Sequence, residues 1–126
     1  MEKEKRGTSR VVFLDSIKMG DYEKVHELLY TIPNIMNQVD SNGKNALHYA
    51  ALYCRDSLEI IELLLQQHLV SDIINGYDND KDTPLDVAIK YNINSQFRND
   101  IMDLIRHKGG KRTENEEDVS DYEDNR

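Results

Sequence analysis

The sequence predicts an all-α solenoid in which helix-turn-helix pairs are stacked and joined by projecting β-turns. Three observations support this prediction. A motif recurs at an offset of 38 residues, each copy contains a helix start, and each copy is followed by an apolar stretch. A period of this length is typical of supersecondary units that bury their apolar faces by stacking on their neighbours.

The recurring motif joins a turn to the start of a helix. It occurs at residues 37–50, as NQVDSNGKNALHYA, and again at residues 75–88, as NGYDNDKDTPLDVA. The shared frame is Asn-x-x-Asp, a turn, a capping pair and Leu-x-x-Ala. Thr83-Pro84 supplies a hydroxyl N-cap and a proline at the first helical position, where the missing N–H is not needed. Asn45-Ala46 predicts the same start in the earlier copy.

The predicted helices form one pair in each of three units. In the first unit, Gly20 ends one helix and Asp21 caps the next, which contains the apolar stretch 25–29. In the middle unit, the second helix is predicted to start at Ser57. It is expected to be buried between neighbours, because residues 60–65 are apolar over much of its surface. In the last unit, the second helix ends at Gly109-Gly110.

The motif resembles the ankyrin-repeat family, whose frame contains a turn, a T-P-L-H-x-A helix start and a helix pair of about 33 residues. Thr83-Pro84-Leu85 matches this start, with Asp86 in the His position, and residues 45–50 keep its Leu, His and Ala. The resemblance covers roughly residues 9 to 110. It implies that His48 is a buried or half-buried hydrogen-bonding residue that ties one repeat to the next.

The resemblance implies three repeats, at about 8–39, 40–77 and 78–110, and two of them are longer than the family norm. The middle repeat has extra residues around Cys54–Asp56 and around His68–Asp72, and the last has about five extra residues within Tyr91–Asp100. Insertions of this kind map to loops. These loops either reshape one end of the stack or are tolerated, because lengthening a surface loop costs little free energy.

The predicted repeat domain, residues 8–110, is flanked by a disordered segment at 1–7 and a disordered acidic tail at 111–126. Residues 113–126 contain seven acidic side chains and one arginine, so six of the eight net negative charges lie there. Such a segment buries too little apolar surface to fold alone. It either solubilises the chain or acts as an electrostatic arm for a basic surface. Within it, Ser120 is a candidate phosphorylation site for an acid-directed kinase.

The acidic run Asp78–Asp82 raises the question of a calcium site, because Asp-x-Asp-x-Asp opens an EF-hand loop. The loop would need Gly where Thr83 stands and a bidentate Glu where Ile89 stands. We therefore predict a solvated turn and no metal site. The single Cys54 and the four dispersed histidines do not form a catalytic or zinc-binding pattern, so no enzyme activity and no cofactor are predicted.

Several other classes of protein are excluded by composition. The body of the chain carries no basic patch and the net charge is −8, which opposes direct binding to nucleic acid. No apolar run is long enough for a membrane helix, and the charged N-terminus is not of the signal-peptide type. The expected location is intracellular, in the cytoplasm or nucleus, or in the host cytosol if the source is a pathogen, symbiont or virus.

The resemblance implies a non-catalytic module that binds a protein partner through its turn tips and concave helix face, as a monomer or as a subunit of a hetero-complex. The alternative is an inhibitor similar to those of NF-kappa-B, in which the acidic tail covers a basic nucleic-acid-binding surface of the partner. The aspartates of the last turn would suit a partner with a basic surface. The implied partner-facing residues are Lys18, Met19, Ser41, Asn42, Lys44, Leu52, Tyr53, Asn79, Asp80, Asp82, Lys90 and Tyr91.

Overall fold

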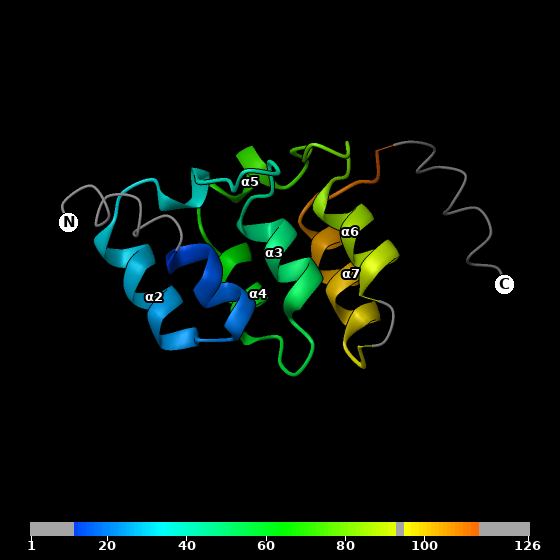
Figure 1. Cartoon of the computed structure of the whole chain (residues 1–126). Coiled ribbons are helices and arrows are strands. Elements are labelled where there is room, and N and C mark those ends of the chain that lie inside the picture. The colour runs from blue at the N-terminus through cyan, green and yellow to red at the C-terminus, as the bar shows by residue number, and fades with distance from the viewer. Residues whose placement is uncertain (1–11, 93–94, 114–126) are drawn as a thin grey trace, which may run out of the picture.

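The computed structural model describes residues 12–92 and 95–113 (Figure 1). The predicted N-terminal segment 1–7, Ser120 and the acidic residues of the tail lie outside these ranges. All regular structure in the described residues is helical, which confirms the predicted all-α class. Within this part of the chain, every helix is too short or too polar to cross a lipid bilayer.

The helices follow one another as stacked pairs along the long axis of the molecule (Figure 1). A helix over residues 12–19 is paired with α2 (Tyr22–Thr31), α3 (Ala46–Tyr53) with α4 (Glu59–Leu65), and α6 (Pro84–Tyr91) with α7 (Arg98–His107). Two short helical turns, η1 (Ile35–Asn37) and α5 (Val70–Ile73), precede the turns that lead into α3 and α6. Helix α3 packs on α6, and α4 packs on both α2 and α7, so the pairs form a solenoid.

The helix starts of the recurring motif are confirmed. Helix α6 begins at Pro84, and the Thr83 hydroxyl accepts the backbone N–H of Asp86 at 3.2 Å. Helix α3 begins after Asn45, whose side-chain oxygen accepts the backbone N–H of Leu47 at 2.8 Å. These caps satisfy N–H groups that have no partner inside the first turn of a helix, which is why the capping residues predict the boundaries.

The predicted start of the middle repeat's second helix at Ser57 is wrong by two residues. Helix α4 begins at Glu59, and the Ser57 hydroxyl accepts the Glu59 N–H at 3.0 Å. Serine side chains readily form such local bonds to a backbone group two residues ahead, and these bonds hold a turn rather than a helix.

The core is a continuous aliphatic layer between the helix pairs. Ile61 and Leu64 of α4 are fully buried, as expected for a helix enclosed by neighbours on several sides. Ala50 and Ala51 of α3 are also fully buried. Their small side chains let the α3 backbone approach the adjacent helices closely.

The inserted residues pack on the stack rather than extending away from it. The segment after α6 places Asn92 in the interior, fully buried, where its Nδ2 donates to the carbonyl of Ala51 at 2.7 Å. The insertion near His68–Asp72 includes α5, whose Val70 and Ile73 are buried. These segments therefore contribute contacts between repeats.

The predicted boundary between repeat domain and tail lies at residue 110, but the chain remains attached to the stack beyond it. The Thr83 hydroxyl donates to the carbonyl of Lys111 at 2.7 Å, and the backbone N–H of Thr113 donates to Asp86 at 3.1 Å. Residues 111–113 thus belong structurally to the last repeat.

Neighbouring turns touch at Gly43. This glycine has φ +80°, a left-handed conformation, and the turn is joined to the next one by a 2.8 Å hydrogen bond from the Asn79 N–H to the Asn42 carbonyl. A Cβ at position 43 would lie 2.8 Å from Asn79 Oδ1 and 3.2 Å from Asn79 N. Position 43 therefore requires glycine both for its backbone conformation and for the space beside Asn79.

We expect Gly43→Ala to destabilise the protein more than Gly20→Ala. Both glycines have positive φ, +80° and +78°, but a Cβ at Gly20 would meet nothing within 4 Å. Gly20→Ala should cost about 1 kcal/mol for the left-handed conformation alone, and Gly43→Ala about 1 kcal/mol more for the forced separation of the turns. Urea denaturation followed by circular dichroism measures both. Equal losses would show that the contact between turns has no energetic role.

Candidate protein-binding surface

The middle and last repeats are tied together by His48. Its side chain is fully buried, its Nδ1 accepts the backbone N–H of Asn45 at 3.0 Å, and its Nε2 lies 2.8 Å from the carbonyl of Asp82. Because Nδ1 accepts, the ring proton is on Nε2 and is donated to that carbonyl. The implied role of His48 in joining two repeats thus corresponds to a defined pair of hydrogen bonds.

The stability of the protein should fall on mild acidification because of His48. Burial lowers the pKa of this imidazole below its ordinary value of 6.5, despite the hydrogen bond to Asp82, which favours the charged form. The full stabilisation is therefore present above pH 6.5. It is lost as the pH falls below that value, because the unfolded chain then binds a proton that the folded chain does not.

Urea midpoints between about pH 7.5 and pH 5.5 test this, with His48→Gln as the matched variant that cannot titrate. The wild-type midpoint should fall with pH by more than the midpoint of the variant. Identical pH profiles would assign the acid sensitivity to other groups.

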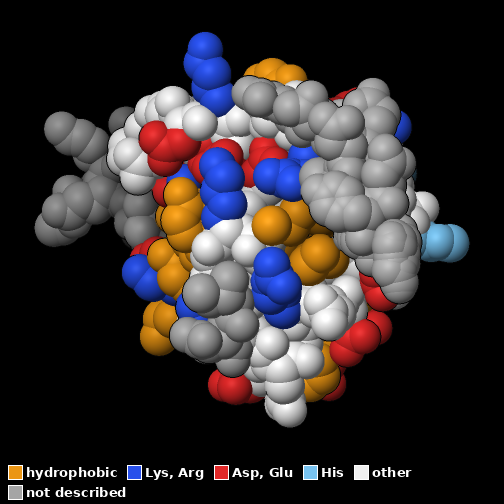
Figure 2. Space-filling view, turned by 90° about the vertical axis from the view of Figure 1, so that its right-hand side faces the viewer, with side chains coloured by type: hydrophobic (Ala, Val, Ile, Leu, Met, Phe, Trp, Pro, Cys, Tyr) orange, Lys and Arg blue, Asp and Glu red, His pale blue; other side chains and the backbone are white. Residues whose placement is uncertain are grey.

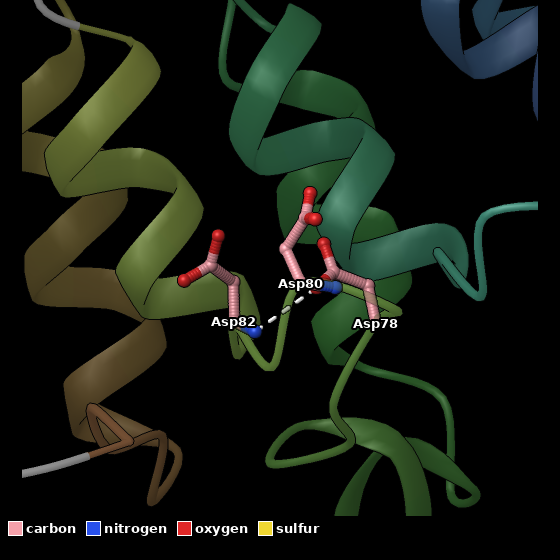
Figure 3. Close-up of side chains that lie close together, drawn as sticks. All are labelled: Asp78, Asp80 and Asp82. Atoms are coloured by element: carbon pink, nitrogen blue, oxygen red, sulfur yellow. Dashed lines mark hydrogen bonds between the residues drawn. The ribbon is translucent and has the colours of Figure 1, made fainter.

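The acidic turn before α6 is held together internally (Figure 3). Asp78 Oδ1 accepts the backbone N–H groups of Asp80 and Asp82, each at 2.9 Å, and Asp78 Oδ2 pairs with Lys44 Nζ at 2.7 Å. Asp82 Oδ1 pairs with Lys90 Nζ at 2.6 Å. Asp78 and Asp82 are 5% and 3% exposed, whereas Asp80 is exposed to solvent.

This geometry bears on two readings of the acidic turn. Candidate ligand atoms of Asp78, Asp80 and Asp82 lie within 4.8 Å of one another, but two of the three carboxylates already carry a lysine ammonium group. The arrangement is that of a neutralised, self-capped turn. For the same reason Asp82 does not present a free charge to a basic partner, and Asp80 is the member of the turn that faces solvent.

Predicted partner-facing residues of the first and middle repeats come together at the ends of two helices. Lys18 Nζ lies 5.2 Å from the ring centroid of Tyr53, and Met19 beside it is 79% exposed. We call Lys18, Met19, Leu52 and Tyr53 the helix-end patch. A hollow of about 260 Å³ opens here, bordered by Lys18, Met19 and Tyr53 and by the loop that follows α3.

An aromatic row extends from the helix-end patch to the turn of the middle repeat. The rings of Tyr53 and Tyr49 have centroids 5.6 Å apart, and the Tyr49 hydroxyl donates to Asp40 Oδ2 at 2.8 Å. Tyr49 is not among the predicted contact residues, but it supports Tyr53, which is. The row therefore links the patch to the turn tips along one side of α3.

The other predicted contact residues have different surroundings. At the turn tips, Asn79 Nδ2 donates to the carbonyl of Ser41 at 3.2 Å, so these residues hold adjacent turns together. Lys44 and Lys90 neutralise the buried aspartates described above. Tyr91 is 48% exposed at the end of α6, in the position equivalent to Tyr53.

Two exposed apolar residues near the turns were not predicted as contact residues. Val39 is 44% exposed and Tyr77 is 61% exposed, and each precedes the aspartate of its turn by one residue. The signal was available in the sequence, because the 38-residue offset places Val39 and Tyr77 in equivalent positions.

The single cysteine of the chain is part of the core. Cys54 is 7% exposed at the end of α3, and burial raises the pKa of its thiol to about 11. Since the thiolate is the nucleophilic form, this environment does not favour covalent catalysis.

Comparison with known proteins identifies the repeat type. A family model described as ankyrin repeats matches residues 13–115 in three copies. The chain belongs to the ankyrin-repeat family. Ankyrin repeats are generally protein–protein interaction modules and are typically non-catalytic. No curated protein and no solved structure matched the chain in the corresponding searches.

Proposed function

We propose that this ankyrin-repeat chain binds another protein, without catalysis, and that the helix-end patch is central to the contact. The observation that carries the proposal is the exposure of Met19, 79%, beside the Lys18–Tyr53 pair. Met and Tyr are enriched in protein interfaces, where they bury a large area, and Tyr loses little rotamer freedom on binding. Tyr91 at the equivalent end of α6 extends the same surface to the last repeat.

The proposal also defines what the partner meets at the turns. Val39 and Tyr77 offer exposed apolar area, and Asp80 offers one unpaired position in an otherwise neutralised turn. A mixed apolar and polar surface of this kind suits a protein ligand better than a purely electrostatic one.

The test begins with crosslinking of the intact chain and mass spectrometry to identify a partner, followed by affinity measurements. The double variant Tyr53→Ala/Tyr91→Ala should weaken binding at least about tenfold, as expected when interface anchors are truncated. Tyr30→Ala is the matched control, since Tyr30 is 77% exposed but lies on α2, away from the patch. Unchanged affinity in a double variant that keeps its helical circular dichroism would refute the proposal.

A second candidate function is suggested by the charge of the tail. Six of the eight net negative charges lie in residues 113–126, which favours inhibition of a partner by covering its basic surface. A chain truncated after Thr113 should then lose affinity at low salt and show a weaker salt dependence. Equal affinity of both chains at low and high salt would eliminate this function and leave the first proposal intact.

A further inference from the structure

The segment after α7 lies where a further repeat would stack. In the middle repeat, Asn45 Nδ2 donates to the carbonyl of Ile73, 28 residues ahead, at 3.0 Å. In the last repeat, the equivalent residue Thr83 donates its hydroxyl to the carbonyl of Lys111, also 28 residues ahead, at 2.7 Å. Residue 111 therefore has the same relation to the last repeat that Ile73 has to the middle one.

Residues 109–113, which we call the C-terminal strap, are held close to the stack. Asn75 Nδ2 donates to the Gly109 carbonyl at 3.1 Å, and the Lys111 N–H donates to Asn75 Oδ1 at 2.7 Å. Gly109 has φ +100°, and a Cβ at Gly110 would lie 2.2 Å from Ile105 Cγ2. Both glycines allow the chain to reverse direction tightly after α7.

Asp86 receives the strap. It occupies the position in which the middle repeat has His48, and His48 donates to a carbonyl of the next repeat. An ionised Asp86 has no proton to donate, so it accepts instead: from the Thr113 N–H at 3.1 Å, from the Thr113 hydroxyl at 2.5 Å and from Arg112 Nε at 3.2 Å. Burial alone would raise the pKa of Asp86, but the hydrogen bonds from Thr113, Thr83 and Arg112 outweigh burial and lower it.

The end of the stack around the strap is densely charged. Acidic and basic side chains lie next to one another above a small hydrophobic group (Figure 2). A hollow of about 380 Å³ opens here, where Lys81, Lys90 and Arg112 face Asp80, Asp82 and Asp86. Opposite charges are balanced at this hollow, so an added charge would disturb it.

The hydroxyl of Thr113 is the most sensitive group in this arrangement. Its Oγ1 lies 2.5 Å from Asp86 Oδ2 and 2.7 Å from the carbonyl of Lys81, and both neighbours are acceptors. The hydroxyl proton is thus required for the contact. The sequence continues with Glu114, Glu116 and Glu117, an acidic context of the kind that acid-directed kinases recognise.

We propose that Thr113 is a phosphorylation site at which modification releases the C-terminal strap. A serine/threonine kinase would transfer the γ-phosphoryl group of ATP to Thr113 Oγ1 during a transient opening of the strap. The new P–O bond replaces the O–H bond, ADP leaves, and the proton passes to the kinase base. The product has no hydroxyl proton for Asp86 and carries about two negative charges against that carboxylate, so the strap no longer docks.

The first experiment treats the full chain carrying Ser120→Ala with an acid-directed kinase and ATP. We expect phosphate on Thr113 by mass spectrometry. Amide hydrogen exchange of residues 110–113 should then become at least about tenfold faster, because the strap loses several hydrogen bonds. Asp86→Asn should raise the initial rate of modification by loosening the strap. Absence of phosphate on Thr113 in a reaction that modifies Ser120 of the wild type overturns the proposal, as does phosphate on Thr113 with unchanged exchange.

The second experiment does not depend on the kinase. Thr113→Ala removes the hydroxyl, and Thr113→Glu removes it and adds a negative charge. With Asp86 present, Thr113→Glu should accelerate exchange in the strap more than Thr113→Ala does. In the Asp86→Asn background this difference should shrink, because the opposing carboxylate is gone. If the two substitutions have equal effects with Asp86 present, charge at position 113 does not release the strap and the proposal fails.

Discussion

Replacing His48 with alanine will lower the free energy of unfolding by about 3 kcal/mol. The substitution removes the acceptor of the Asn45 N–H and the donor to the Asp82 carbonyl, and both backbone groups are left without these bonds in the interior. Each buried polar group left unpaired costs about 1–3 kcal/mol, and the lost ring adds a cavity. Urea denaturation measures the difference.

His68→Ala is the control for this prediction. His68 is exposed, so its removal should change the free energy of unfolding by less than about 0.5 kcal/mol. A loss for His48→Ala no greater than that of the control would mean that the two repeats are joined by apolar packing alone.

Leu64→Ala will destabilise the protein by about 3 kcal/mol, the second large effect. Leu64 is fully buried on α4, which packs against the second helices of both neighbouring repeats. Truncation removes apolar contacts and leaves a cavity in the middle of the stack. A chain of three repeats is near the minimum for a stable stack, so the whole chain should unfold earlier in one transition.

Leu63→Ala provides the comparison on the same helix. Leu63 is only partly buried, and its truncation should cost about 1 kcal/mol. Thermal and urea denaturation of the two variants give the ratio. Equal destabilisation would show that the interior around α4 is loosely packed and can relax around a missing side chain.

The fold was predictable because its signals are local. Thr83 and Asn45 cap the helices that begin at the next residue, so the sequence around each cap determines the boundary. Ser57 shows the limit of this reasoning, since its hydroxyl stabilises a turn before α4 instead of the first turn of the helix. A short polar side chain has both options, and packing of the flanking residues decides between them.

The candidate site was less predictable because its partners are distant in sequence. Asp82 reads as an exposed turn residue, yet it is buried and paired with Lys90, and Asp78 is paired with Lys44, 34 residues earlier. Composition placed Thr113 in an acidic tail, whereas its contacts with Asp86, 27 residues earlier, place it on the last repeat. Pairings over such separations depend on the stacking of repeats, which no single segment specifies.

The exchange of histidine for aspartate between positions 48 and 86 also gives the array a direction. The middle repeat offers a proton to whatever follows it, while the last repeat accepts protons from the chain that closes it. A protein engineer who wished to lengthen this molecule should therefore insert new copies between the middle and last repeats. Copies appended after α7 would meet a carboxylate that cannot bond to their backbone carbonyl and a closing segment already in place.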